Sequence, residues 1–219
     1  MRSMGPAILI ASSQSADKFH DRAFALAPKK PSVAWIGAAH GDTPGGFERT
    51  AALLAKRYGA RMLHAHCSSP ADAQKIVAGA DFVYLGGGDV RLLTERLRSA
   101  GLDETIRRRH ADGAVVLGVS AGAIGLTPAW IDFPDEEGPP TRFPCLGAVP
   151  IAVDVHDEES DWEELRALLA VWGRESPDAV VEAYGIPVAG ALELDAGGAV
   201  TTLGRAPKRL RLDHGRVIE

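Results

Sequence analysis

The chain has 219 residues, of which 46% are hydrophobic and 24% are charged, a composition typical of a globular protein with a sizeable buried core. Its 24 basic and 29 acidic residues give a net charge of −5, which argues against a nucleic-acid-binding protein. The only two cysteines, Cys67 and Cys145, exclude a disulfide framework, so we expect free thiols in a reducing compartment, the cytoplasm. The apolar runs fall far short of the roughly 20 residues of a membrane span, and the first residues lack the features of a secretory signal. We therefore expect no membrane partner.

Short apolar runs alternate with helical patterns along the whole chain, without a repeat or a long linker. This alternation predicts a single α/β domain over residues 1–219, with three α/β/α layers around a mostly parallel central sheet. Continuous apolar runs are typical of strands buried on both faces, and they predict strands over 7–11, 33–37, 61–66, 82–85, 114–119 and 148–155. Helices are predicted over 45–58, 72–78, 90–100 and 102–110, and from residue 160 onward.

Two later segments differ from this pattern. Residues 128–144 are rich in proline, glycine and acids. Their apolar residues repeat neither every 2 residues, as in a strand, nor every 3.6, as in a helix. We therefore expect a surface loop long enough to act as a lid or binding loop. After Pro177, turn signals at 195–198 and 213–215 predict short strands that extend the sheet in antiparallel fashion. Between these segments, Ser160 and Glu163 have the spacing of a capping box at the start of a helix.

The segment Gly118-Val119-Ser120-Ala121-Gly122 has the G-x-S-x-G pattern of a nucleophile elbow, between a buried strand and a helix. A serine at such a turn projects its hydroxyl above the carboxyl end of the sheet. The N–H of Ala121, at the start of the helix, would point toward a developing oxyanion. The pattern therefore predicts Ser120 as a nucleophile, and the competing interpretation is a tight packing turn with a silent serine.

A second turn, Gly86-Gly87-Gly88-Asp89, also joins a buried strand to a helix, which Asp89 is expected to cap. It lacks the G-x-G-x-x-G pattern and the lysine of a phosphate-binding loop, so nucleotide binding is disfavoured. We expect this turn to supply a second oxyanion donor, with Gly87 and Asp89 contacting substrate in the crevice above the sheet.

A nucleophilic serine needs a general base. His156 follows the predicted strand 148–155 and is therefore expected at the same edge as Ser120, whereas His214 in the C-terminal hairpin is the second choice. Several acids surround His156, and the sequence leaves open which carboxylate orients it. His64 and His66 lie two residues apart without a carboxylate at suitable spacing, so no metal site is expected.

Taken together, these segments resemble the aspartyl dipeptidase (dipeptidase E) and cyanophycinase family of serine peptidases, which have the class I glutamine amidotransferase-like (flavodoxin-like) fold. The resemblance extends over about residues 7–203, and it rests on residues 85–89, 118–123 and 146–156. It implies Ser120 as the nucleophile, His156 as the general base, and the N–H groups of Gly88 and Ala121 as the oxyanion hole. It also implies the absence of a metal or cofactor.

One position departs from the family pattern. Val188 stands where the dipeptidases carry the glutamate of the triad, and Glu182 or Glu193 is expected to replace it, or an acid near His156 such as Asp157. An acidic substrate would favour an arginine in its pocket, for which Arg142 in the expected loop is the candidate.

The sequence thus predicts a serine-type peptidase that acts on small peptides, and the resemblance implies Asp-initiated or aspartyl-linked substrates. We expect a monomer or homodimer. A second hypothesis is a catalytically inactive or weak binding protein of the same fold, because the triad glutamate is not evident. A third is an esterase of the α/β-hydrolase type that uses Ser120, Asp195 and His214 in that order.

Overall fold

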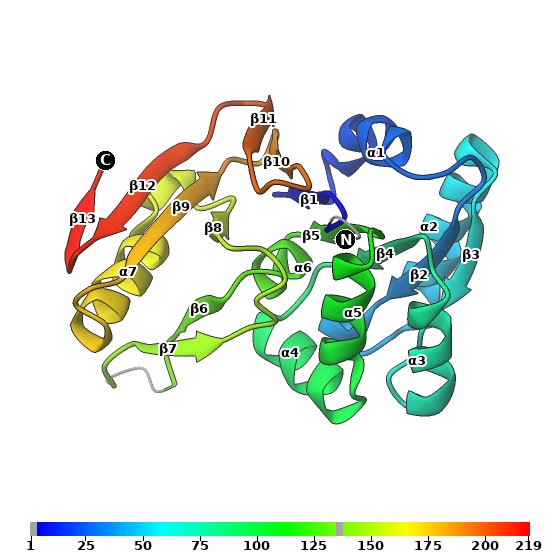
Figure 1. The fold of residues 1–219 in the computed structure, drawn as a ribbon, viewed down its shortest axis with the longest axis horizontal. Coiled ribbons are helices and arrows are strands. Elements are labelled where there is room, and N and C mark those ends of the chain that lie inside the picture. The colour runs from blue at the N-terminus through cyan, green and yellow to red at the C-terminus, as the bar shows by residue number, and fades with distance from the viewer. Residues whose placement is uncertain (1–3, 135–137) are drawn as a thin grey trace.

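The computed structural model describes residues 4–134 and 138–219. Residues 1–3, at the start of the N-terminal segment, and residues 135–137, within the expected 128–144 loop, lie outside the described residues. A seven-stranded central sheet has the order β11-β10-β1-β5-β4-β2-β3 (Figure 1). Its parallel strands are β1 (Ala7–Ile10), β5 (Val115–Val119), β4 (Phe82–Leu85), β2 (Ser32–Ile36) and β3 (Arg61–His64). Two antiparallel strands, β10 (Gly190–Leu194) and β11 (Val200–Gly204), extend the sheet beyond β1. The expected mostly parallel α/β sheet is confirmed.

Helices cover both faces of this sheet, because successive side chains of its buried strands point to opposite faces. In β1, Ile8 and Ile10 pack with α1 (Ala16–Ala25) and α2 (Pro44–Tyr58). Leu9 packs on the other face with α3 (Pro70–Ala78), α4 (Val90–Ser99), α5 (Leu102–Ala111) and the short α6 (Ala121–Gly125). The sequence did not predict α1, which follows β1 directly.

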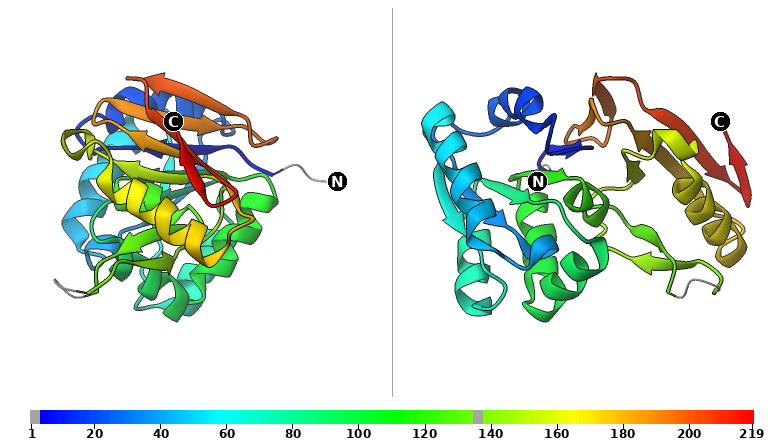
Figure 2. Two further views of the ribbon diagram at one scale, coloured as in Figure 1. Left: turned by 90° about the vertical axis from the view of Figure 1, so that its left-hand side faces the viewer. Right: turned by 180° about the vertical axis from the view of Figure 1, so that it is seen from behind.

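A second sheet lies beside the first and has the order β13-β12-β9-β8 (Figures 1 and 2). It consists of β8 (Ala152–Val155), β9 (Val180–Ile186), β12 (Lys208–Asp213) and β13 (Arg216–Ile218). The expectation that the whole C-terminal part extends the central sheet is therefore wrong. Only β10 and β11 do so, because alternate residues of β9 and β12 bury their side chains against α7 (Glu163–Glu175) in a separate core.

The segment expected as an irregular loop contains a hairpin, β6 (Ala129–Asp132) and β7 (Thr141–Pro144). Ala129 and Ile131 are buried in the core that also contains α7, so the hairpin has an apolar face despite its loop-like composition. The expected contact between Ser160 and Glu163 is present, because Ser160 Oγ accepts a hydrogen bond from the Glu163 N–H at 3.3 Å. The helix α7 nevertheless begins only at Glu163, with Trp162 at the N-cap position in the left-handed region.

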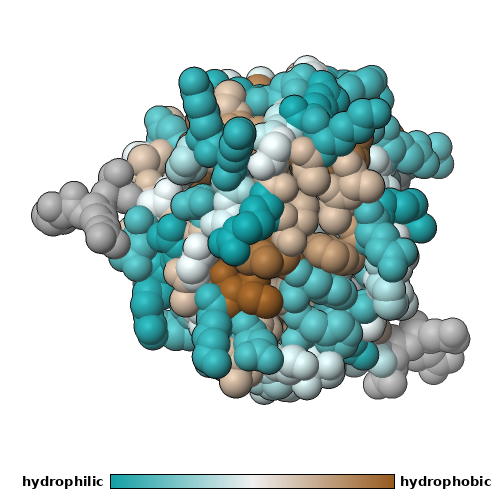
Figure 3. Space-filling model, turned by 90° about the vertical axis from the view of Figure 1, so that its right-hand side faces the viewer, coloured by the Kyte–Doolittle hydropathy of each residue, from teal (hydrophilic) through white to brown (hydrophobic). Residues whose placement is uncertain are grey.

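The surface beside β3 is mostly hydrophilic and surrounds a limited apolar patch (Figure 3). No helix within residues 4–134 and 138–219 is long and apolar enough to cross a membrane. Two short 3₁₀ helices, η1 (Ala38–His40) and η2 (Glu158–Ser160), follow β2 and β8. Both lie at strand ends on the side of the molecule that carries Ser120.

Candidate active site

Ser120 occupies a strained turn between β5 and α6. Its backbone dihedrals are φ 52° and ψ −119°, a region that residues other than glycine rarely adopt. Hydrogen bonds on both sides hold it there: its N–H donates to the Ile10 carbonyl at 2.9 Å, and its own carbonyl accepts the Ala123 N–H at 2.8 Å. This geometry is that of a nucleophile elbow, as the G-x-S-x-G pattern predicts.

The glycines of the elbow are required by close backbone packing. A Cβ at Gly118 would lie 2.3 Å from the Gly122 carbonyl oxygen, and a Cβ at Gly122 would lie 2.4 Å from the Leu85 carbonyl oxygen. The elbow therefore packs directly against the end of β4, where the second glycine-rich turn begins.

The turn Gly86–Asp89 passes beside Ser120. Gly88 has φ 142°, and a Cβ there would lie 2.2 Å from the Ala39 carbonyl oxygen, so only glycine fits. Asp89 caps α4 as predicted, because its Oδ1 accepts the Leu92 N–H at 2.6 Å. Among the described turn and loop hydrogen bonds between backbone groups, none is donated by the N–H of Gly88 or of Ala121.

His156 follows β8 and reaches Ser120 from the second sheet. Its Nε2 lies 3.1 Å from Ser120 Oγ, which is hydrogen-bond distance for a nucleophile and its base. The backbone N–H of His156 donates a hydrogen bond to the Ile186 carbonyl at 2.9 Å, so β9 helps to position this residue and its imidazole. No described carboxylate forms a hydrogen bond or ion pair with the His156 ring.

Two cavities meet at Ser120. One, of about 250 Å³, contains His156 and extends toward β8 and the start of α7. The other, of about 430 Å³, lies on the opposite side and is lined by His40, Arg49 and the glycine-rich turn. Gly88 borders both cavities, so a bound carbonyl carbon at Ser120 would have space on either side.

The smaller cavity, which we call the acidic cavity, is lined by Asp89 and by three carboxylates near His156: Asp154, Asp157 and Glu164. Asp154 is only 6% exposed; its Oδ1 accepts the Val155 N–H at 2.8 Å. Asp154 Oδ2 and Asp157 Oδ2 are buried and have no hydrogen-bond partner in the described part of the chain.

The pKa values of two of these carboxyls are raised. Burial, joined by the negative charges of Glu164 and Asp157, raises the pKa of Asp154 to about 7, and the N–H groups of Val155 and Leu165 only partly oppose it. Burial also raises the pKa of Glu164, with the charge of Asp157 as the next cause. The acidic cavity thus concentrates negative charge, and its described lining includes no arginine or lysine to offset it.

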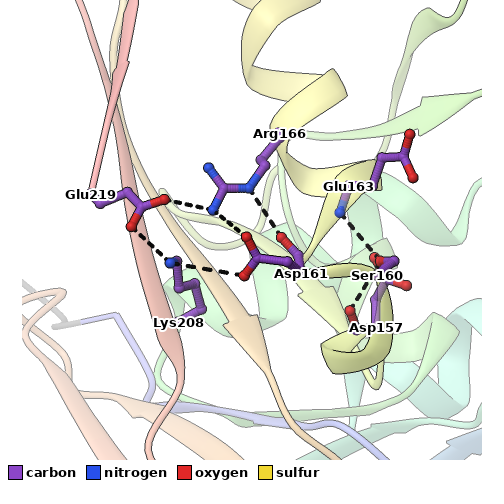
Figure 4. A network of polar contacts seen from close by, with 7 residues as sticks. All are labelled: Asp157, Ser160, Asp161, Glu163, Arg166, Lys208 and Glu219. Carbon is purple, nitrogen blue, oxygen red and sulfur yellow. Dashed lines mark hydrogen bonds and ion pairs between the residues drawn. The ribbon is translucent and has the colours of Figure 1, made fainter.

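The turn between β8 and α7 is held by a polar network on its outer side (Figure 4). Arg166 donates to Asp161 Oδ2 at 2.9 Å and to Glu219 Oε1 at 2.6 Å, and Lys208 donates to Glu219 Oε2 at 2.8 Å. Within the turn, Ser160 Oγ donates to the Asp157 carbonyl at 3.1 Å. The network fixes the backbone of Asp157. Its two cations, Arg166 and Lys208, pair with Asp161 and Glu219 rather than with the carboxylates of the acidic cavity.

Several residues singled out from the sequence do not reach Ser120. Glu182, on β9, accepts from Arg209 at 3.1 Å and lies 3.6 Å from Arg211, so its carboxylate is engaged in ion pairs elsewhere. Arg142, on β7, forms an ion pair with Glu175 at 2.6 Å and lies over the Trp172 ring; it lines neither cavity at Ser120.

Three further residues with suitable acid or base chemistry also lie apart from Ser120. Glu193 forms two hydrogen bonds of 2.6 Å with Arg22. His214 contacts Asp213 at 2.8 Å in the β12–β13 hairpin, and Asp195 accepts N–H groups within its own turn. The esterase arrangement of Ser120, Asp195 and His214 is therefore not assembled.

Sequence reasoning missed part of the site. Glu164 and Trp130 line the acidic cavity, and Arg49 and Tyr84 line the opposite one, yet they come from helices and strands distant along the chain. For Asp154, the one available signal was the presence of a carboxylate inside the apolar strand Val153-Asp154-Val155. For Glu164, on the first turn of α7, no feature of the sequence indicates a place in the site.

Comparison with known proteins identifies relatives. The B. subtilis (strain 168) protein "Uncharacterized peptidase YgaJ" is 37% identical over 78 residues; the match covers 35% of this chain and spans only about a third (32%) of that protein. The solved structure of a peptidase from an acI-B1 Actinobacterium has a TM-score of 0.72 at 20% identity and covers 99% of this chain and 97% of that one.

A candidate peptidase E from Listeria monocytogenes EGD-e has a TM-score of 0.67 at 18% identity, over 93% of this chain and all (100%) of that one. At these identities the two structures support the fold, which is flavodoxin-like α/β. The family model of peptidase family S51 matches residues 7–190, well over half of the chain. The chain therefore belongs to peptidase family S51, the dipeptidase E and cyanophycinase family that its motifs resemble.

Proposed function

We propose that this chain is a serine peptidase that hydrolyses small peptides, with Ser120 as nucleophile and His156 as general base and acid. The observation that carries this proposal is the 3.1 Å separation of Ser120 Oγ and His156 Nε2 at a strained elbow. Membership of peptidase family S51 supports the same chemistry.

In the proposed reaction, Ser120 Oγ attacks the peptide carbonyl carbon while His156 Nε2 takes the hydroxyl proton. The N–H groups of Gly88 and Ala121 stabilise the oxyanion, because both lie at turns bordering Ser120 and neither donates to another backbone carbonyl among the described turn contacts. His156 then gives its proton to the leaving amine. A water molecule, activated by His156 in the same way, releases the acid product and restores Ser120.

Asp157 is the proposed orienting acid for His156. It follows His156 directly and lines the same cavity, whereas Glu182 is held by two arginines. Catalytic hydrogen bonds are often completed only when substrate binds, so the free Asp157 Oδ2 is available for this role. Gly87 and Asp89, at the mouth of the cavities, are proposed substrate contacts.

The small volumes of the two cavities favour small peptides over long chains. The cavity of about 430 Å³ is in the range of small-ligand sites, and the cavity of about 250 Å³, which meets it at Ser120, is slightly smaller. We propose dipeptides and aspartyl-linked peptides as the first substrates to test, in keeping with the resemblance to dipeptidase E and cyanophycinase.

The test is to treat the protein with a small serine-directed phosphonylating reagent and to locate the adduct by mass spectrometry. We expect a stoichiometric adduct on Ser120, none in Ser120→Ala, and a rate reduced at least about 100-fold in His156→Ala. His214→Ala is the matched control, because it removes an exposed histidine that lies apart from both cavities. An adduct on Ser120 that forms equally fast without His156, or none at all, would favour the non-catalytic binding protein.

A further inference from the structure

The acidic cavity contains more negative charge than the proposed hydrolysis requires. Its lining includes four carboxylates, Asp89, Asp154, Asp157 and Glu164, of which Asp89 caps α4, and no arginine or lysine lines it among the described residues. The imidazole of His156 has one ring nitrogen left after Nε2 contacts Ser120. A single carboxylate suffices to orient it. Two carboxylates remain without a function in the reaction.

Nearby cations do not neutralise them. Arg166, on α7, and Lys208, on β12, pair with Asp161 and Glu219 (Figure 4). Arg91, on α4, pairs with Asp132 and Glu95. The local positive charge is thus engaged on the outside of the cavity.

Asp154 is the strongest sign that a ligand belongs here. A buried carboxylate is normally paired or fully hydrogen-bonded, because an isolated buried charge is costly. Asp154 is 6% exposed and lines the cavity, and its Oδ2 has no hydrogen-bond partner in the described structure. Its pKa of about 7 is the expected consequence of burial beside two other carboxylates without a cation. An N–H donor entering through the cavity would supply the missing partner.

The remaining lining of the acidic cavity suits the carbon skeleton of such a ligand. Val90, Ile124 and Trp130 line the same cavity and give it apolar surface. Glu164, on the first turn of α7, is more exposed than Asp154. The cavity therefore combines the nucleophile, an apolar surface and a group of carboxylates.

We propose that the acidic cavity is a subsite for an organic cation of the substrate, an ammonium or a guanidinium group, held by Asp154 and Glu164. This inference rests on the proposed peptidase function, since it places the cation on the molecule that Ser120 attacks. The group is either the free α-ammonium of a short peptide or the side chain of a basic residue. Substrates with a carboxylate at this position are disfavoured.

The first experiment compares diphenyl phosphonates of equal length whose four-carbon tails end in an ammonium, a hydroxyl or a carboxylate. Ser120 Oγ forms a bond to phosphorus and phenol leaves, so the labelling rate needs no knowledge of the substrate. We expect the ammonium reagent to label Ser120 at least about 10-fold faster than the hydroxyl reagent, because a charge-assisted hydrogen bond contributes about that factor. The carboxylate reagent should be the slowest.

Variants test whether this preference depends on the acidic cavity. Asp154→Asn and Glu164→Gln should each lower the ratio of ammonium to hydroxyl labelling rates by about 3- to 10-fold, with little change in the hydroxyl rate. Glu163→Gln is the matched control, because it removes an exposed carboxylate from the adjacent position of α7 that does not line the cavity. Glu164→Gln, at a more exposed position, keeps the test valid if Asp154→Asn fails to fold.

The outcomes separate the two proposals. If no reagent labels Ser120, the proposed peptidase function fails. If the hydroxyl reagent labels Ser120 as fast as the ammonium reagent, the peptidase function stands and the cation subsite is refuted. A ratio that Asp154→Asn and Glu164→Gln both leave unchanged also refutes it.

Coumarin amides then identify the source of the cation. Faster cleavage of free alanyl than of acetyl-alanyl amide would assign the subsite to the α-ammonium group. Faster cleavage of acetyl-lysyl than of acetyl-alanyl amide would assign it to a basic side chain. Equal rates for all three would contradict a cation subsite of either kind.

Discussion

The substitution Asp154→Asn should stabilise the protein at high pH and have little effect at low pH. In the folded protein the pKa of Asp154 is about 7, against a value of 3.8 for an ordinary aspartate. Between these two values the folded protein binds more protons than the unfolded chain, so stability falls as pH rises through this interval. An asparagine of the same shape does not titrate, and therefore the variant escapes this loss.

The size of the effect follows from the shift. A change from 3.8 to about 7 corresponds to about 4 kcal/mol when the whole interval is crossed, at 1.36 kcal/mol for each pKa unit. About 2.5 kcal/mol of this falls between roughly pH 5 and pH 8. The advantage of the variant over the native protein should therefore grow by about that amount across this range.

Urea unfolding of both proteins at about pH 5 and pH 8 measures this difference directly. Glu163→Gln, which removes an exposed carboxylate of α7, is the matched control for the loss of one negative charge. If the free energy of unfolding of Asp154→Asn relative to that of the native protein stays constant or falls as pH rises, the reasoning is refuted. That result would mean that Asp154 is ionised in the folded protein throughout.

Three further substitutions test other parts of the structure. Gly88→Ala should reduce Ser120 labelling at least about 100-fold, because its Cβ would overlap the Ala39 carbonyl oxygen and displace the proposed oxyanion donor. Gly198→Ala, with φ 82° and open space around it, should carry only the backbone strain and keep full labelling; equal losses in both variants would contradict this role. Glu182→Gln should leave the labelling rate within about twofold of native, since a base-orienting acid would cost orders of magnitude. Arg142→Ala should not change which of the carboxylate and hydroxyl phosphonates labels Ser120 faster. A selective loss of labelling by the carboxylate reagent would instead indicate that Arg142 contacts substrate.

Local patterns carried most of the fold. The apolar runs at 82–85 and 115–119 are buried on both faces, so their sequences have no polar alternation and identify central parallel strands. The elbow was also predictable from local sequence, because its glycines are required by close contacts with backbone atoms a few residues away or on the adjacent strand. These constraints act over short distances and leave a direct mark on residue type.

Long-range pairing was much harder to predict. His20 and His110 look like ordinary exposed residues of helical segments, yet both are buried; the first contacts the Tyr84 hydroxyl and the second the Gly5 carbonyl. Glu182 and Arg142 have suitable chemistry for the site, but partners far along the chain hold them elsewhere. Residue type alone does not specify which of several carboxylates a distant arginine will bind.

Because Ser120 follows a strand of the central sheet and His156 follows a strand of the second sheet, the proposed catalytic pair spans two sheets that share one buried core (Figures 1 and 2). The base is held by β9, whose residues lie far beyond His156 in the sequence. A chain synthesised only as far as α7 would carry both side chains but not the strand that positions one of them. Competence for hydrolysis would then arise late during synthesis, once β9 pairs with β8 and its Ile186 carbonyl holds the backbone of His156.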